Sequence, residues 1–63
     1  MKEMTIVVTL KEPNLDWNDL NVKRFEDIIE FYTSITDRLV LINNKSKNYN
    51  IPLDKVANIL ITP

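Results

Sequence analysis

The stretch MTIVVTL, residues 4–10, decides the fold class of this chain. Successive side chains of a β-strand point to opposite faces, so every second residue shares a face. One face of this stretch carries four apolar side chains: Met4, Ile6, Val8 and Leu10. Its many β-branched residues favour an extended backbone. The stretch therefore predicts a strand with one buried face, ended by Lys11-Glu12 and by Pro13, which cannot donate to a ladder.

The second half of the chain predicts two more strands before its C-terminal segment. Residues 39–42, LVLI, form an apolar run typical of a strand that is buried on both faces or lies at an interface. A turn is expected at Thr36-Asp37, before this run. The segment 43–48, NNKSKN, predicts a hairpin loop because Asn tolerates positive φ. The chain then returns as a strand over residues 49–51.

Two further elements are expected near the C-terminus. Pro52 lacks an amide donor and should mark a strand end or a free edge. Residues 53–57 predict one helical turn with Asp54 as its N-cap. Residues 58–62, NILIT, predict a closing strand.

The segment RLVLINNKSKNYNIPLDKVANILIT, residues 38–62, resembles the ending of many small uncharacterised β domains of phages and low-GC Gram-positive bacteria. In those domains an "LVL" strand, a polar hairpin, an "IPL" strand and a final "I-x-I" strand form a meander. The resemblance covers about the last 25 residues. It implies an antiparallel sheet and is consistent with a phage or mobile-element accessory factor, and it specifies no activity.

Residues 12–35 are ambiguous between helix and strand. Residues 12–21 indicate a long loop or a short helical turn that folds over the core. Val22, Phe25, Ile29 and Tyr32 follow a helical spacing. Residues 28–35, however, are mostly β-branched and aromatic, which favours a strand. We favour the strand, with residues 22–26 as a short strand or connection.

The expected fold is therefore mainly β: a small antiparallel sheet or an SH3-like or Sm-like barrel of about five strands, with one short helical turn. The alternative is an α+β fold with a helix near residues 21–33. At 63 residues the chain is expected to form one domain, residues 1–63.

The composition argues against enzymatic activity. The chain contains no histidine, cysteine or glycine. It therefore lacks the ordinary general base at neutral pH, a thiol nucleophile, the usual zinc ligands and a glycine-rich phosphate loop. Glu26, Asp27 and Glu30 form a tight carboxylate cluster, which we interpret as a solvated acidic face. We expect no cofactor, no metal and no small-molecule substrate.

Charge and hydropathy bear on partners and location. The net charge is −1, so the total gives no footprint for nucleic acid, although acidic residues concentrate in 12–37 and basic residues in 38–63. No run approaches the roughly 20 apolar residues of a membrane span. A cytoplasmic protein with no membrane contact is expected, and the separated charges fit self-association.

Seven residues are candidates for partner binding. Trp17 is either a lid residue on the core or an exposed anchor, with Leu15 and Leu20 beside it. Phe31 and Tyr32 would point to opposite faces of a strand, so Tyr32 is a candidate outside the core. Lys45, Lys47 and Tyr49 place charge and an aromatic ring at the hairpin.

The leading functional hypothesis is a non-enzymatic protein-interaction module that forms a homo-oligomer or binds another protein. The alternatives are a small barrel that binds single-stranded nucleic acid and a structural component of a larger assembly. The basic hairpin is the feature that supports the nucleic-acid alternative. It lacks the interleaved aromatic and basic pattern of RNA-recognition domains, so nucleic acid is the less favoured partner.

Overall fold

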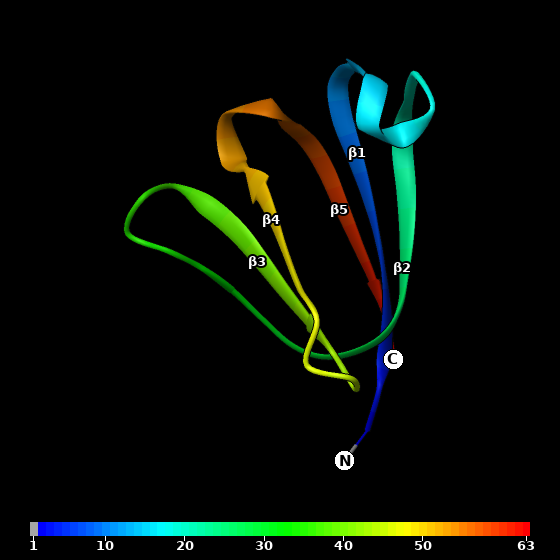
Figure 1. Ribbon diagram of the computed structural model, residues 1–63, viewed down its shortest axis with the longest axis vertical. Helices are drawn as coiled ribbons and strands as arrows, with labels where there is room; N and C mark the ends of the chain where they lie inside the picture. Colours follow the sequence, from blue (N-terminus) through cyan, green and yellow to red (C-terminus); the bar gives the residue numbers. More distant parts are fainter. Residues whose placement is uncertain (1) are drawn as a thin grey trace.

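The computed structural model describes residues 2–63 as a mainly β protein with five antiparallel strands in one sheet (Figure 1). The strands are β1 (Met4–Asn14), β2 (Leu20–Thr33), β3 (Arg38–Asn43), β4 (Asn48–Pro52) and β5 (Val56–Thr62), and the 3-10 turns are η1 (Leu15–Trp17) and η2 (Leu53–Lys55). The expected mainly β fold of about five strands is confirmed. The alternative helix over residues 21–33 is wrong, because those residues lie in β2.

The strands follow the order β4-β3-β2-β1-β5. The first four strands form a meander, and β5 returns to pair with β1. The edge strands β4 and β5 are joined by η2, drawn in orange in Figure 1. No hydrogen-bonded ladder links these two edges among the described residues, so the sheet is not closed. Of the two forms expected from the sequence, the open sheet is the one observed.

One face of the sheet, here called the inner face, carries the hydrophobic core. Its buried side chains come from four strands: Ile6, Val8, Leu10, Phe25, Ile28, Leu39, Leu41 and Ile51. The alternation predicted for residues 4–10 places Ile6, Val8 and Leu10 in this core, with Met4 packed against it. Val40 is also buried although its neighbours Leu39 and Leu41 point inward. Burial of both faces of the 39–42 run is therefore confirmed.

A bulge interrupts the alternation of side chains along β2. Asp27 adopts φ 59°, and the register with β1 shifts between the Ile6–Phe25 and Met4–Ile28 pairs. An extra residue at a bulge changes which side chains share a face. Phe25 and Ile28 therefore both reach the core although they are three residues apart. The stripe noted in the sequence, Val22, Phe25, Ile29 and Tyr32, is not a buried face, because Val22 and Tyr32 are exposed.

The first hairpin is longer than predicted, because β1 extends to Asn14 and β2 begins at Leu20. β1 continues through Pro13 to Asn14, which pairs with Leu20, although the pairing is irregular between Thr9 and Asn14. Proline fits an extended backbone where no ladder donor is needed, so Pro13 did not end the strand. The Asn14 side chain accepts a hydrogen bond from the Asp16 backbone N–H at 2.8 Å and caps η1.

The turns also correct two predictions. In the β3–β4 hairpin the residue with positive φ is Ser46, while the side chain of Asn43 accepts hydrogen bonds from the N–H groups of Lys45 and Lys47, each at 2.9 Å. At η2 the N-cap is Pro52 and no side chain caps the turn, so Asp54 is not the cap. The helical turn ends at Lys55, and β5 begins at Val56, two residues earlier than predicted.

No helix in residues 2–63 is long and apolar enough to span a membrane.

Candidate functional site

Three aromatic rings pack side by side at one end of the inner face. Trp17, from η1, meets the Phe25 ring edge-on, with ring centroids 6.0 Å apart and an interplanar angle of 71°. Phe25 in turn lies 4.9 Å from Tyr49 of β4. Edge-to-face pairs of this kind add about 0.5–1.5 kcal/mol beyond the area they bury. This aromatic row (Trp17, Phe25 and Tyr49) joins η1, β2 and β4 into one cluster.

Two lysines lie over the aromatic row. The Lys23 Nζ is 5.4 Å from the Phe25 ring centroid and 6.0 Å from that of Trp17. The Lys47 Nζ is 5.2 Å from the Tyr49 ring centroid. These distances fall within the range of cation–π attraction. Sequence reasoning selected Trp17, Lys47 and Tyr49 but missed Phe25 and Lys23, because only the β2 register brings them to this cluster.

The other predicted partner-binding residues do not join the aromatic row. Leu15 on η1 and Leu20 at the start of β2 are both exposed. Trp17 between them is half-buried and packs against the core, as a lid residue would. Lys45 is exposed in the β3–β4 turn. Trp17 is thus less exposed than the two leucines on either side of it in the sequence.

A second surface is an apolar trough between β5 and the paired ends of β2 and β3. Its volume is about 340 Å³, and its lining residues are Ile6, Phe31, Tyr32, Thr33, Leu39, Leu41, Ile59 and Ile61. Phe31 pairs with Leu41 and therefore points inward, whereas Tyr32 pairs with Val40 on the outer face. The predicted separation of Phe31 and Tyr32 onto opposite faces is confirmed. Both side chains remain substantially exposed.

The trough exists because the sheet is open at this point. β1 pairs with β2 only as far as Ile28, so the end of β2 has β3 on one side and no strand on the other. Ile59 and Ile61 pair with Val8 and Ile6 of β1, which places them on the inner face opposite that gap. No charged side chain lines the trough.

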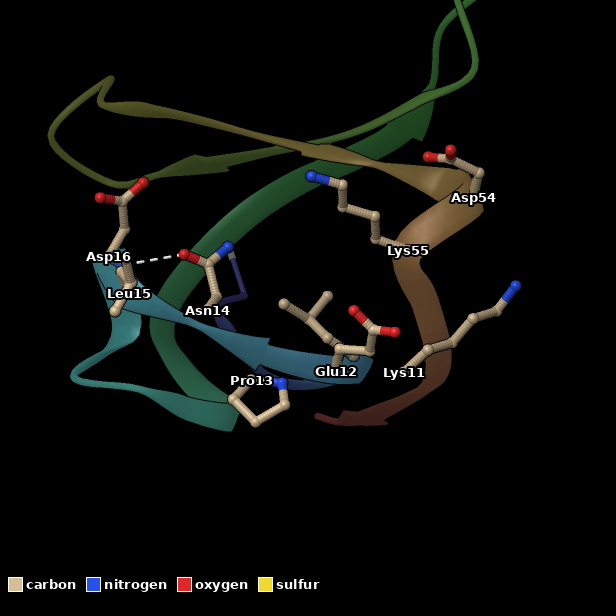
Figure 2. A pocket seen from close by; sticks show the side chains of 9 residues that line it. Lys11, Glu12, Pro13, Asn14, Leu15, Asp16, Asp54 and Lys55 are labelled. Carbon is tan, nitrogen blue, oxygen red and sulfur yellow. Dashed lines mark hydrogen bonds between the residues drawn. The ribbon is translucent and has the colours of Figure 1, made fainter.

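A second hollow, of about 500 Å³, lies between the end of β1 and η2. Figure 2 shows Glu12, Lys55 and Asp54 around its open centre, with Asn14 hydrogen-bonded to Asp16 on one side. Charged side chains of both signs line it, among them Lys11, Glu12 and Lys55. The described residues contain no group of three carboxylates or other ligands arranged to hold a metal ion. The charges around this hollow are therefore not arranged as a metal site in the part of the chain that the structure describes.

Other electrostatic contacts of the described residues are weak. Arg24 Nε and Glu26 Oε2 form an ion pair at 3.4 Å, and both side chains are exposed. Exposed pairs of this kind contribute about 0–1 kcal/mol. The Asn44 side chain donates to Glu3 Oε2 at 2.6 Å, and the Asn44 N–H donates to the Asp27 carbonyl at 2.9 Å. These two bonds hold the β3–β4 turn against Glu3, just before β1, and against the β2 bulge at Asp27.

The fold and these surfaces define a class of small all-β protein with an open five-stranded antiparallel sheet and an apolar trough along one edge. No family model, curated protein sequence or solved structure matches the chain significantly.

Proposed function

We propose that this chain is a non-enzymatic protein-interaction module that binds a second copy of itself. The observation that carries the proposal is the apolar trough, with Phe31 exposed on one rim and Ile59 and Ile61 exposed on the other. Keeping contiguous apolar surface in water is unfavourable, and such patches commonly mark interaction sites. The absence of His and Cys from the sequence supports a binding role over catalysis.

A second copy is the favoured occupant for two reasons. The trough lining is uncharged, so two copies meet there without repulsion between like charges. A 63-residue chain also buries a small share of its surface when it folds alone, so association adds burial that the monomer lacks. We propose a phage or mobile-element accessory factor as the setting of such a module, on the resemblance of residues 38–62 alone.

Solution mass tests the proposal. We expect light scattering behind a sizing column to give twice the chain mass of 7.4 kDa, or a higher multiple of it. That mass should persist when the salt concentration is raised, because apolar contacts are not screened as exposed charges are. A mass of one chain at every protein concentration would contradict self-association. A multimer that dissociates in high salt would assign the contact to the separated charges instead.

Binding of single-stranded nucleic acid is the second candidate, and the aromatic row favours it. Trp17 and Tyr49 are half-buried, and each has a lysine Nζ within 6.0 Å of its ring centroid. Aromatic rings beside cations can stack bases and contact phosphates. Two exposed carboxylates near Trp17, Asp16 and Asp19, oppose such binding.

This candidate predicts that fluorescence polarisation of labelled single-stranded DNA or RNA rises with protein at low salt and falls steeply as salt increases. Replacing Lys23 and Lys47 by Glu should abolish the signal. Replacing Lys11 and Lys55 by Glu changes the net charge equally but leaves the aromatic row intact, and it should retain most of the signal. Equal loss in both double variants would indicate non-specific charge attraction, and no polarisation change with the native chain would eliminate the candidate.

A further inference from the structure

The outer edge of β5 is the least protected strand edge of the described chain. β5 pairs with β1 on one side and has no strand on the other. Its seven residues, VANILIT, include no charge and no proline. Its pairing with β1 has one register shift, between Val56 and Asn58, and is regular from Asn58 to Thr62. The opposite edge, β4, has five residues and ends in Pro52. Strand edges normally carry lysine, proline or a bulge that prevents pairing with another chain. The part of β5 beyond its register shift, Asn58–Thr62, has none of these and is competent to accept an added strand.

Apolar side chains are exposed on both faces of β5. Ile59 and Ile61 are 36% and 42% exposed on the inner face, and Leu60 is 57% exposed on the outer face. A partner that docks on one face of the sheet would leave the other set in water. A strand added at the edge places side chains beside both sets, since neighbouring strands share both faces of a sheet. The exposure pattern therefore favours strand addition.

The segment Asn58–Thr62 is self-complementary. Its pattern of a polar residue, Ile, Leu, Ile and a polar residue is symmetrical about Leu60. An isologous two-fold contact requires such a patch, because each residue meets its symmetry mate. We infer that β5 pairs antiparallel with β5 of a second copy about a two-fold axis at Leu60, and this inference rests on the proposed self-association.

The two-fold axis sets the register. Leu60 faces Leu60 of the other copy on the outer face, and Ile59 faces Ile61 on the inner face. The register of a strand pair follows its apolar pattern because a slip of one residue exchanges the two faces. The second copy's isoleucines then extend the apolar rim along which Ile59 and Ile61 line the trough. One contact thus covers the edge and the β5 rim of the trough together.

The first test places a charge on the edge. Leu60→Lys removes two leucines from the dimer, one from each copy, and brings two ammonium groups together at the axis. We expect the dissociation constant to rise by about 100-fold or more. Ile35→Lys introduces the same charge at a fully exposed apolar residue between β2 and β3, outside the edge, and should leave the mass unchanged.

The second test reads the register with a cysteine, since the native chain has none. Opposed residues of antiparallel strands have Cα atoms about 4.5–5.5 Å apart, which is within the reach of a disulfide. Leu60→Cys should therefore cross-link into a covalent dimer under mild oxidation. Thr62→Cys lies on the same face, but its symmetry mate is four positions away, roughly 13 Å, and should not cross-link.

Three outcomes separate this inference from the proposed function. Cross-linking of Leu60→Cys alone, with a monomeric Leu60→Lys variant, supports β5 pairing. A native dimer that Leu60→Lys leaves intact overturns β5 pairing while self-association stands. A native chain that is monomeric by mass at every concentration overturns self-association, and β5 pairing with it.

Discussion

Replacing Leu41 by alanine is expected to remove most of the stability of this protein. Leu41 is fully buried in β3, between β2 and β4, and belongs to the core of the inner face. Truncating a buried leucine to alanine costs about 2–5 kcal/mol, since the removed atoms lose their burial and leave a cavity. A core in a chain of this length rarely supplies more than about 3–5 kcal/mol net. The variant should therefore be largely unfolded.

The measurement is urea unfolding followed by circular dichroism, at one protein concentration for all variants, because association would shift apparent stability. Leu15→Ala is the matched control: the substitution is the same, but Leu15 is 85% exposed. The free energy of unfolding should change by no more than about 0.5 kcal/mol in the control. A Leu41→Ala variant as stable as Leu15→Ala would contradict the assignment of Leu41 to the core.

The strands were predictable where the pattern was local. Residues 4–10 alternate cleanly because β1 buries a single face there, and the 39–42 run is continuously apolar because β3 is central in its part of the sheet. β2 was ambiguous for a physical reason. The bulge at Asp27, which adopts positive φ, is encoded by a residue that also fits a helix or a turn. The resulting shift in which side chains share a face cannot be recognised from spacing alone.

The interaction surfaces depended on topology, which local patterns do not contain. Ile59, Leu60 and Ile61 are visibly apolar in the sequence, yet a closing strand between two neighbours would have the same composition. Only the return of β5 to β1 leaves this strand at an edge. Likewise, Trp17 and Tyr49 are 32 positions apart in the sequence, and Phe25 connects them because η1, β2 and β4 converge at one end of the inner face.

Replacing Phe25 by alanine is expected to be at least as damaging as the change at Leu41. Phe25 is 5% exposed and contacts both Trp17 and Tyr49. Truncating a buried phenylalanine to alanine costs about 3–5 kcal/mol. The free energy of unfolding should fall by more than it does when a single aliphatic contact is lost. The reason is that the aromatic row connects three elements and each ring pair adds its own attraction.

Phe31→Ala provides the matched control. Phe31 lies on the same strand, but it is 41% exposed at the rim of the trough and is absent from the buried core. We expect a loss of about 1 kcal/mol or less, since an exposed ring gives up little burial when it is removed. The stability of both variants is measured by thermal unfolding at a single low protein concentration, at which association does not cover the trough.

Trp17 supplies a local reading of the Phe25 variant, because it is the only tryptophan of the chain. In Phe25→Leu the core position stays filled by an apolar side chain, so the fold should survive while the edge-to-face contact with Trp17 is lost. Trp17 emission should then shift to longer wavelength with the β-sheet signal retained, and it should stay unchanged in Phe31→Ala. An unaltered emission in Phe25→Leu would mean that the core holds Trp17 without the ring, and the aromatic row would then not be the contact that anchors η1 to the sheet.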